Sequence, residues 1–215
     1  YLIGLTNQET QLALAYNKVE GVEVTVVSGE NEQVLGCFET LQAEGIIFHR
    51  INGFDDHHDL VRLVKKFKSL VDTIRPNVVS VNTNWQLLIA ALARVFGSRD
   101  FKIVYTLHGF RHNHPTKAIV ARFLIGTLLF FFADSINAPS SYVKKKFSVL
   151  RYKMATIPLG EDDIFFENSV IPDFSTPLFF CFPGQFRFGK NQALLIEAFA
   201  RYKEITKDTQ ARLFL

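Results

Sequence analysis

The chain has 215 residues, enough for one large domain or for one domain and part of another. Its 48% apolar and 21% charged residues are ordinary globular usage, and a net charge of +3 is too small to predict nucleic-acid binding by itself. Cys37 and Cys181 form no CxxC pair, which disfavours a zinc site and favours free thiols in a reducing compartment. The most apolar run, residues 123–133, is shorter than the roughly 20 residues that span a bilayer.

Strand and helix patterns alternate along the first 160 residues. Residues 1–5 are predicted to form a short strand, and Thr6 and Glu9 have the spacing of a capping box that opens the following helix. Further strands are predicted at 22–29, 46–51, 77–82, 101–107, 135–140 and 154–158, and helices at 31–45, 59–71, 85–97, 116–132 and 141–149. This alternation predicts an α/β fold with a doubly wound parallel sheet and right-handed crossovers.

The pattern breaks at residues 159–177, which hold five acidic residues and two prolines and have no clear period. A strand at 178–182, a helix ending near residue 206 and a strand from residue 211 follow. We therefore expect a Rossmann-like domain over 1–160, a linker over 161–177, and the first β-α-β of a second Rossmann-like domain over 178–215.

Polar side chains follow two strands of the predicted sheet. Asn84 and Trp85 come after the strand at 77–82, and His108 and Arg111 come after the strand at 101–107. Ligands of open α/β sheets bind outside the carboxyl ends of the strands, and amides, an imidazole and an indole suit hydroxyl-rich ligands. We predict a binding site there, with core packing as the alternative for Trp85.

Histidines and cations in the loops suggest two other kinds of site, a metal site and a phosphate site. His108, His112 and His114 lack a carboxylate or thiolate at helical spacing, so no metal site is predicted. Arg187 and Lys190 flank the start of a predicted helix, where unpaired amides and the helix dipole attract phosphate. The alternative is that both are exposed surface cations. The chain has neither GxGxxG nor GxxxxGK[ST], so no nicotinamide cofactor and no P-loop are predicted.

Several segments together resemble one family. "IPLGEDDIFF" resembles the motif I-P-N-G-V-D-x-x-x-F, and "FPGQFRFGKNQALLIEAF" resembles V-G-R-L-x-x-x-K-G-x-x-x-L-I-E-A-F. "VNTNWQLLIAALA" and "IVYTLHGF" fit the segments of the first domain. The chain is thereby similar to glycosyltransferase family four, which comprises retaining enzymes of the GT-B fold.

The resemblance implies a hexosyltransferase whose first domain binds the acceptor and whose second binds a nucleotide sugar as substrate, with no other cofactor. Lys190 and Gly184 match positions beside the donor diphosphate, and His108 matches a histidine near the transferred sugar. Gln185 stands where the family usually has Arg, and Arg187 is expected to replace that contact. The expected acceptor is a glycan or a lipid-linked sugar of polysaccharide biosynthesis.

Other departures limit what the 215 residues are expected to do. Residues 6–10, "TNQET", replace the family's glycine-rich turn, and Leu159 stands where the motif has Asn. The acidic E-x7-E segment of the family is absent, so we expect this chain to be inactive alone. The alternatives are a non-catalytic sugar- or lipid-binding half-module and a GT-B sugar-nucleotide epimerase, which needs carboxylates in its cleft.

Cations beside apolar segments suggest a location. The Phe-rich helix at 116–132 is followed by Lys144, Lys145 and Lys146, and the helix at 59–71 carries four further cations. Basic residues near apolar surface suit an anionic membrane. We expect a cytoplasmic protein. Two interpretations of the apolar and basic segments stay open: a peripheral site at the inner membrane face, or a Phe-rich helix that is covered inside its domain.

Overall fold

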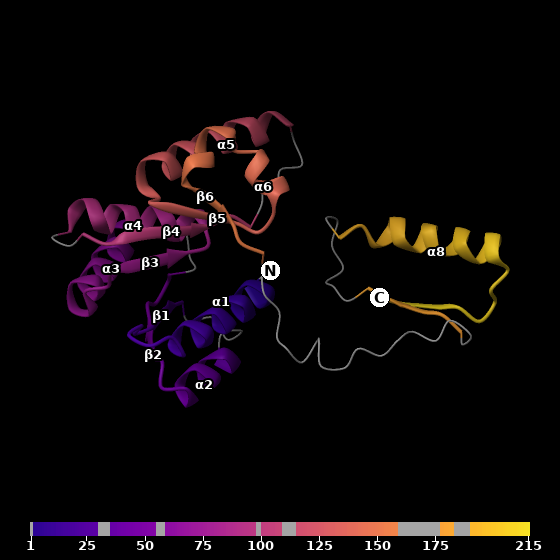
Figure 1. Ribbon diagram of the computed structural model, residues 1–215, viewed down its shortest axis with the longest axis horizontal. Coiled ribbons are helices and arrows are strands. Elements are labelled where there is room, and N and C mark those ends of the chain that lie inside the picture. The colour runs from indigo at the N-terminus through magenta and orange to yellow at the C-terminus, as the bar shows by residue number, and fades with distance from the viewer. Residues whose placement is uncertain are drawn as a thin grey trace. The chain divides into compact units, whose positions relative to one another are not determined.

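The computed structural model describes residues 2–29, 35–54, 59–97, 100–108, 115–158, 177–182 and 190–215 (Figure 1). The chain divides into two compact units, Tyr1–Asp162 and Asp163–Leu215. The linker predicted at 161–177 lies almost wholly outside the described residues, so its limits stay a prediction.

The first unit is built from parallel strands with helices between them, as the alternation predicted. Its strands are β1 (Thr25–Ser28), β2 (Ile47–Arg50), β3 (Val78–Val81), β4 (Lys102–Thr106), β5 (Ser135–Ala138) and β6 (Met154–Thr156). Its helices are α1 (Leu2–Asn17), α2 (Leu35–Ala43), α3 (Leu60–Ile74), α4 (Asn84–Phe96), α5 (Pro115–Phe132), α6 (Ser141–Lys145) and the 3-10 helix η2 (Ser148–Lys153). The hydrogen-bonded orders are β1-β2 and β3-β4-β5-β6, and every pair is parallel. The Rossmann-like α/β prediction is therefore confirmed.

The beginning of the chain differs from the prediction. Residues 2–5 are the first turn of α1 and form no strand, so Thr6 lies inside the helix and the capping box predicted for Thr6 and Glu9 is wrong. A short apolar run does not distinguish a strand from a helix, and here the helical run that follows it decides. In the usual Rossmann strand order, 3-2-1-4, the strand predicted at residues 1–5 would be strand 1. It would lie between β1 and β3 and pair with both. Among the described residues these two strands are not paired, and the sheet is divided.

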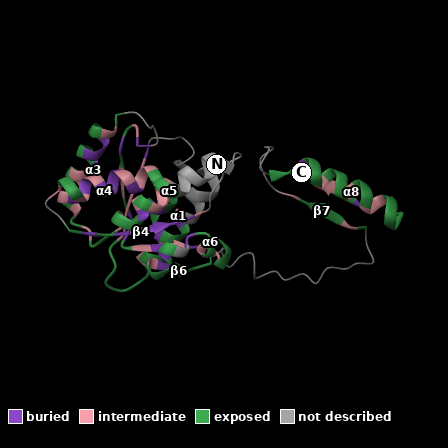
Figure 2. Ribbon diagram, turned by 90° about the horizontal axis from the view of Figure 1, so that it is seen from above, coloured by how far each residue is buried: buried purple, intermediate pink, exposed green. Residues whose placement is uncertain are grey.

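The main hydrophobic core lies between the four-stranded sheet and the helices beside it. Figure 1 shows α3 and α4 beside β3, and Figure 2 shows buried residues gathered along β4 and these helices. The amphipathic pattern of α3 is confirmed, since Leu63, Val64 and Phe67 are buried. Burying a Leu or Ile side chain fully contributes about 1.5–3 kcal/mol. The fully buried ones around this sheet are Leu63, Leu87, Ile89, Ile103, Leu107, Leu129 and Ile136.

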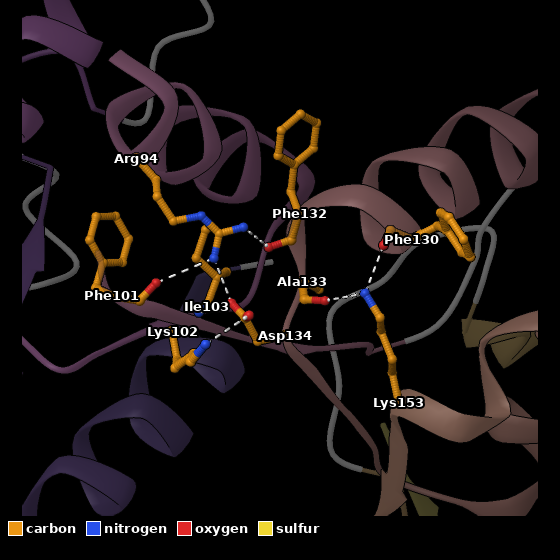
Figure 3. Close-up of polar contacts among 9 residues, drawn as sticks. All are labelled: Arg94, Phe101, Lys102, Ile103, Phe130, Phe132, Ala133, Asp134 and Lys153. Carbon is orange, nitrogen blue, oxygen red and sulfur yellow. Dashed lines mark hydrogen bonds and ion pairs between the residues drawn. The ribbon is translucent and has the colours of Figure 1, made fainter. Parts of the chain in front are cut away.

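A cluster of polar contacts ties α4 to β4 and to the end of α5 (Figure 3). The guanidinium of Arg94 donates to the backbone oxygens of Phe132 at 2.8 Å and Phe101 at 3.3 Å, and it pairs with the carboxylate of Asp134. That carboxylate also accepts the backbone N–H of Ile103 at 2.8 Å. Burial alone would raise the pKa of Asp134. The Ile103 N–H and Arg94 outweigh this effect and hold the pKa below its ordinary 3.8.

Lys153 binds the C-terminal end of α5 as well (Figure 3). Its Nζ donates to the backbone oxygens of Phe130 at 2.7 Å and Ala133 at 2.9 Å. The last carbonyls of a helix have no partner within the helix, and a cation is favourable at this negative end of the dipole. Arg94 and Lys153 together therefore fix where α5 ends and β5 begins.

The second unit contains β7 (Phe179–Cys181), α8 (Gln192–Thr206) and β8 (Arg212–Phe214). β7 pairs with β8 in parallel, so its elements follow the β-α-β order that the sequence predicted. The ring of Phe180 packs 5.6 Å from that of Phe199 and 5.2 Å from that of Tyr202, which joins β7 to α8. Most described residues of this unit are exposed (Figure 2).

Candidate functional site

The carboxyl ends of β3 and β4 carry the candidate site. The two strands are neighbours in register, with Val81 opposite Tyr105, so the residues that follow them meet at one edge of the sheet. Oδ1 of Asn82, directly after β3, lies 3.4 Å from Nε2 of His108, which follows β4. The structure thus brings together side chains that are 26 residues apart in the sequence.

A capping box fixes the turn that bears Asn82. The side chain of Thr83 accepts the backbone N–H of Gln86 at 3.2 Å. In return, Oε1 of Gln86 accepts the backbone N–H groups of Thr83 at 3.2 Å and Asn82 at 2.9 Å. The Thr-x-x-Gln spacing is the usual sequence signal for this motif. It starts α4 one residue earlier than predicted and gives the site a rigid border.

Asn84 is held by a buried tyrosine. The hydroxyl of Tyr105 donates to Oδ1 of Asn84 at 2.7 Å. Burial raises the pKa of Tyr105 to about 12, so its hydroxyl keeps its hydrogen at neutral pH. With its oxygen bound by Tyr105, Asn84 can offer a ligand the N–H donors of its amide.

Trp85 stands in the first turn of α4, at the expected edge of the sheet. Its ring is half-buried and packs against the main core, and its indole nitrogen is buried. This position supports the alternative that Trp85 is a packing residue.

His108 is half-buried beside Asn82. Burial disfavours the charged imidazolium, so the pKa of His108 lies below its ordinary 6.5. The ring is therefore neutral at pH 7, with one nitrogen that donates a hydrogen bond and one that accepts.

Glu9 reaches the same edge from α1. Its Oε1 accepts a hydrogen bond from Nδ2 of Asn82 at 2.8 Å. The two residues are 73 positions apart, and the sequence offered only a helix-cap role for Glu9. No local pattern could have predicted this contact.

The predicted donor-side residues belong to the second unit. Lys190 is exposed and stands two residues before α8, next to Asn191, whose φ is 59°. Gly184 and Arg187 lie outside the described residues, as does Arg111 of the predicted acceptor side. Gln192, the first residue of α8, is buried, and the sequence did not single it out.

The described residues contain neither a candidate metal cluster nor a candidate membrane-spanning helix. No three His, Cys, Asp or Glu side chains within the described ranges come close enough to share a metal ion. None of the described helices combines the length and the apolar character that crossing a membrane requires.

Comparison with known proteins links this arrangement to a family. The chain is similar in structure to HepE (Alr3699) of Anabaena, solved with UDP and glucose: 16% identity, TM-score 0.69, covering 99% of this chain and 66% of that one. It is similar to the lipopolysaccharide outer core galactosyltransferase WaaB in its apo form: 13% identity, TM-score 0.63, 99% and 64% covered. It is also similar to S. aureus MnaA, solved with UDP: 13% identity, TM-score 0.54, covering 97% of this chain and 58% of that one.

The chain thus spans about two thirds or less of these solved structures, and at such identities they show a shared fold. No match was found among curated proteins. The family model described as Glycosyltransferase Family 4 matches residues 4–163, which is most of the chain. The chain therefore belongs to Glycosyltransferase Family 4.

Proposed function

We propose that this chain carries the acceptor side and the first donor contacts of an enzyme that moves a hexose from a nucleotide sugar to a hydroxyl of a glycan or lipid-linked acceptor, with retention. The observation that carries the proposal is the contact of neutral His108 with Asn82 at the carboxyl edge of β3 and β4. Family membership supports sugar transfer. The UDP in the HepE and MnaA structures supports a nucleoside diphosphate as the leaving group.

Each residue has a distinct role in this proposal. His108 and the Asn84 amide orient a hydroxyl of the acceptor or of the transferred sugar by hydrogen bonds. Lys190, with Gly184 and Arg187, contacts the donor diphosphate as negative charge grows on it. Cations and helix amides aimed at developing charge lower the barrier because they are already oriented when the charge appears.

Nucleoside diphosphate release by the full-length protein tests the donor assignment. Charge-assisted hydrogen bonds contribute about 1.5–3 kcal/mol, so Lys190→Ala should lower transfer about tenfold or more. Lys207→Ala, at the opposite end of α8, is the matched control and should leave transfer unchanged. Equal rates for both variants would remove Lys190 from the donor site.

The same assay separates the alternative functions. Binding of nucleotide sugars without diphosphate release would indicate a sugar- or lipid-binding half-module. Conversion of the donor sugar without any acceptor would indicate an epimerase. Product stereochemistry by NMR tests retention.

An exposed apolar surface on α5 favours an anionic membrane as a further partner. The outer α5 face, defined here as Phe123, Leu124, Phe130 and Phe131, is 73%, 58%, 43% and 67% exposed. Leu129, on the opposite side of the helix, is fully buried. The alternative of a helix covered on all sides is therefore not supported.

Lys153 lies beside this surface, in a segment rich in cations. Residues 115–158 contain seven Lys and Arg but a single acidic residue, Asp134. The Nζ of Lys153 lies 5.6 Å from the Phe130 ring and 5.8 Å from the ring of exposed Tyr152. The cations of α3 are less suited, because Arg62 and Lys68 pair with carboxylates of their own helix region. We therefore propose the α5–η2 side as the membrane-facing side.

Vesicle flotation tests the membrane proposal. Each cation near an anionic surface contributes about 1 kcal/mol, so binding should require anionic lipid and weaken with salt. Phe123→Ser with Phe131→Ser should abolish flotation, whereas Val61→Ser on the exposed side of α3 should not. A chain that stays unbound to anionic vesicles at low salt would refute the proposal.

A further inference from the structure

Three elements meet through one line of hydrogen-bonding side chains. Glu9 lies on α1, Asn82 follows β3 and His108 follows β4. The Glu9–Asn82 contact measures 2.8 Å, and Asn82 Oδ1 lies 3.4 Å from His108 Nε2. Asn82 therefore stands between a carboxylate and an imidazole.

The direction of each bond follows from its partner. Carboxylate oxygens only accept, so Glu9 requires the NH₂ end of the Asn82 amide and turns the Oδ1 end toward His108. An oxygen that only accepts then requires a hydrogen on Nε2 of His108. A neutral imidazole has one hydrogen, and with that hydrogen on Nε2, Nδ1 carries a lone pair.

The main chain of Asn82 keeps the amide in this position. Its backbone N–H donates to Oε1 of Gln86 at 2.9 Å, and the same oxygen accepts from Thr83. These bonds hold the backbone of Asn82 in place. The side-chain amide can still rotate, and the hydrogen bond to Glu9 selects its orientation.

We propose that Glu9 is a positioning residue that, through the amide of Asn82, keeps His108 in the tautomer with hydrogen on Nε2, so that Nδ1 accepts a hydrogen bond from a sugar or acceptor hydroxyl. The identity of this hydroxyl rests on the proposed sugar transfer. The relay itself rests only on the contacts among the three side chains.

Long-range ¹H–¹⁵N NMR spectra of the histidine-labelled chain test the relay, because they report which ring nitrogen carries hydrogen. They are recorded near pH 8, well above the ordinary histidine pKa of about 6.5, and His108→Gln identifies the His108 signals. A hydrogen bond with a net value of about 1 kcal/mol predicts that the contact favours the Nε2–H form by about fivefold.

Variants separate the relay from a merely structural contact. Glu9→Ala leaves the Asn82 amide free to turn, so the excess of the Nε2–H form should fall. Glu9→Lys replaces an acceptor with a donor, so the Asn82 amide should turn and the Nδ1–H form should predominate. Asn82→Ala removes the amide that stands between Glu9 and His108, so it should lower the Nε2–H excess as far as Glu9→Ala does. Glu23→Lys makes the same charge change at an exposed position before β1 and should change nothing.

The outcomes are distinct. An Nδ1–H majority in the unmodified chain, or a Glu9→Lys variant with native circular dichroism and an unchanged tautomer, overturns the relay and leaves the proposed transfer standing. An intact tautomer bias in a protein that transfers no sugar from any nucleotide donor supports the relay and overturns the proposed function.

Discussion

Replacing Asp134 by Ala should destabilise the first unit by about 1–4 kcal/mol. The carboxylate accepts the N–H of Ile103, a fully buried residue, and a buried donor left without a partner costs about 1–3 kcal/mol. In the ion pair with Arg94, the side chain of Asp134 is 32% exposed and that of Arg94 is 19% exposed. This pair contributes at most about 1 kcal/mol. Lys102, 3.7 Å away and 65% exposed, contributes little.

Urea unfolding followed by tryptophan fluorescence measures this change. Trp85 is the single tryptophan and lies in the first unit, so the signal reports that unit alone. Asp134→Asn keeps an acceptor for Ile103 and should cost about 1 kcal/mol or less. Asp100→Ala, at an exposed position before β4, is the matched control.

The stability difference between the unmodified chain and the Asp134→Asn variant should decrease at low pH. The pKa of Asp134 is depressed in the folded chain, so its contribution to stability is fully present above the ordinary value of 3.8 and is lost as the pH falls through the folded value. The gap between the unmodified chain and Asp134→Asn should therefore narrow below about pH 4. Equal midpoints for Asp134→Ala and Asp100→Ala at pH 7 would refute the reasoning, as would an Asn variant as unstable as the Ala variant.

Three further predictions follow from single contacts. His108 should titrate by NMR with a midpoint below 6.5, and a midpoint above 6.5 would contradict its burial. The neutral ring favours the folded state above the unfolded pKa, and this contribution to stability should be lost as the pH falls through the folded pKa. Leu129→Ala should cost about 2–5 kcal/mol in urea unfolding, whereas Phe131→Ala should stay within about 0.5 kcal/mol, and equal costs would mean that the outer α5 face is covered. Thr83→Ala should cost about 1 kcal/mol, and no loss would show that the capping box does not stabilise α4.

Sequence patterns correctly predicted the elements that depend only on neighbouring residues in the chain. The three- and four-residue spacing in α3 follows from the geometry of a single helix, and His108 stands at a strand end because a buried apolar run stops just before it. The neighbouring positions of β3 and β4 then brought His108 to the predicted edge. Parallel strands place their carboxyl ends together whatever the rest of the sequence contains.

Other features depend on packing that a sequence pattern does not record. The helix predicted at 141–149 ends at Lys145 and gives way to η2, in which Leu150 enters the main core. The Nζ of Lys144 turns back to the backbone oxygen of Met154 at 2.7 Å. The contact of Glu9 with Asn82 likewise requires α1 and β3 to be folded together before it exists.

The divided sheet has a consequence for local unfolding. The region of α1, β1, α2 and β2 has its own small core of Ala13, Leu41 and Ile46, and among the described residues no strand pairing links it to β3. Cooperative units with few buried contacts open at lower free energy than the rest, so amides of β1 and β2 should exchange hydrogen faster than those of β4 and β5. Each such opening would carry Glu9 away from Asn82. The arrangement of Asn82 and His108 would then depend on the fraction of time for which the region of α1, β1, α2 and β2 is folded.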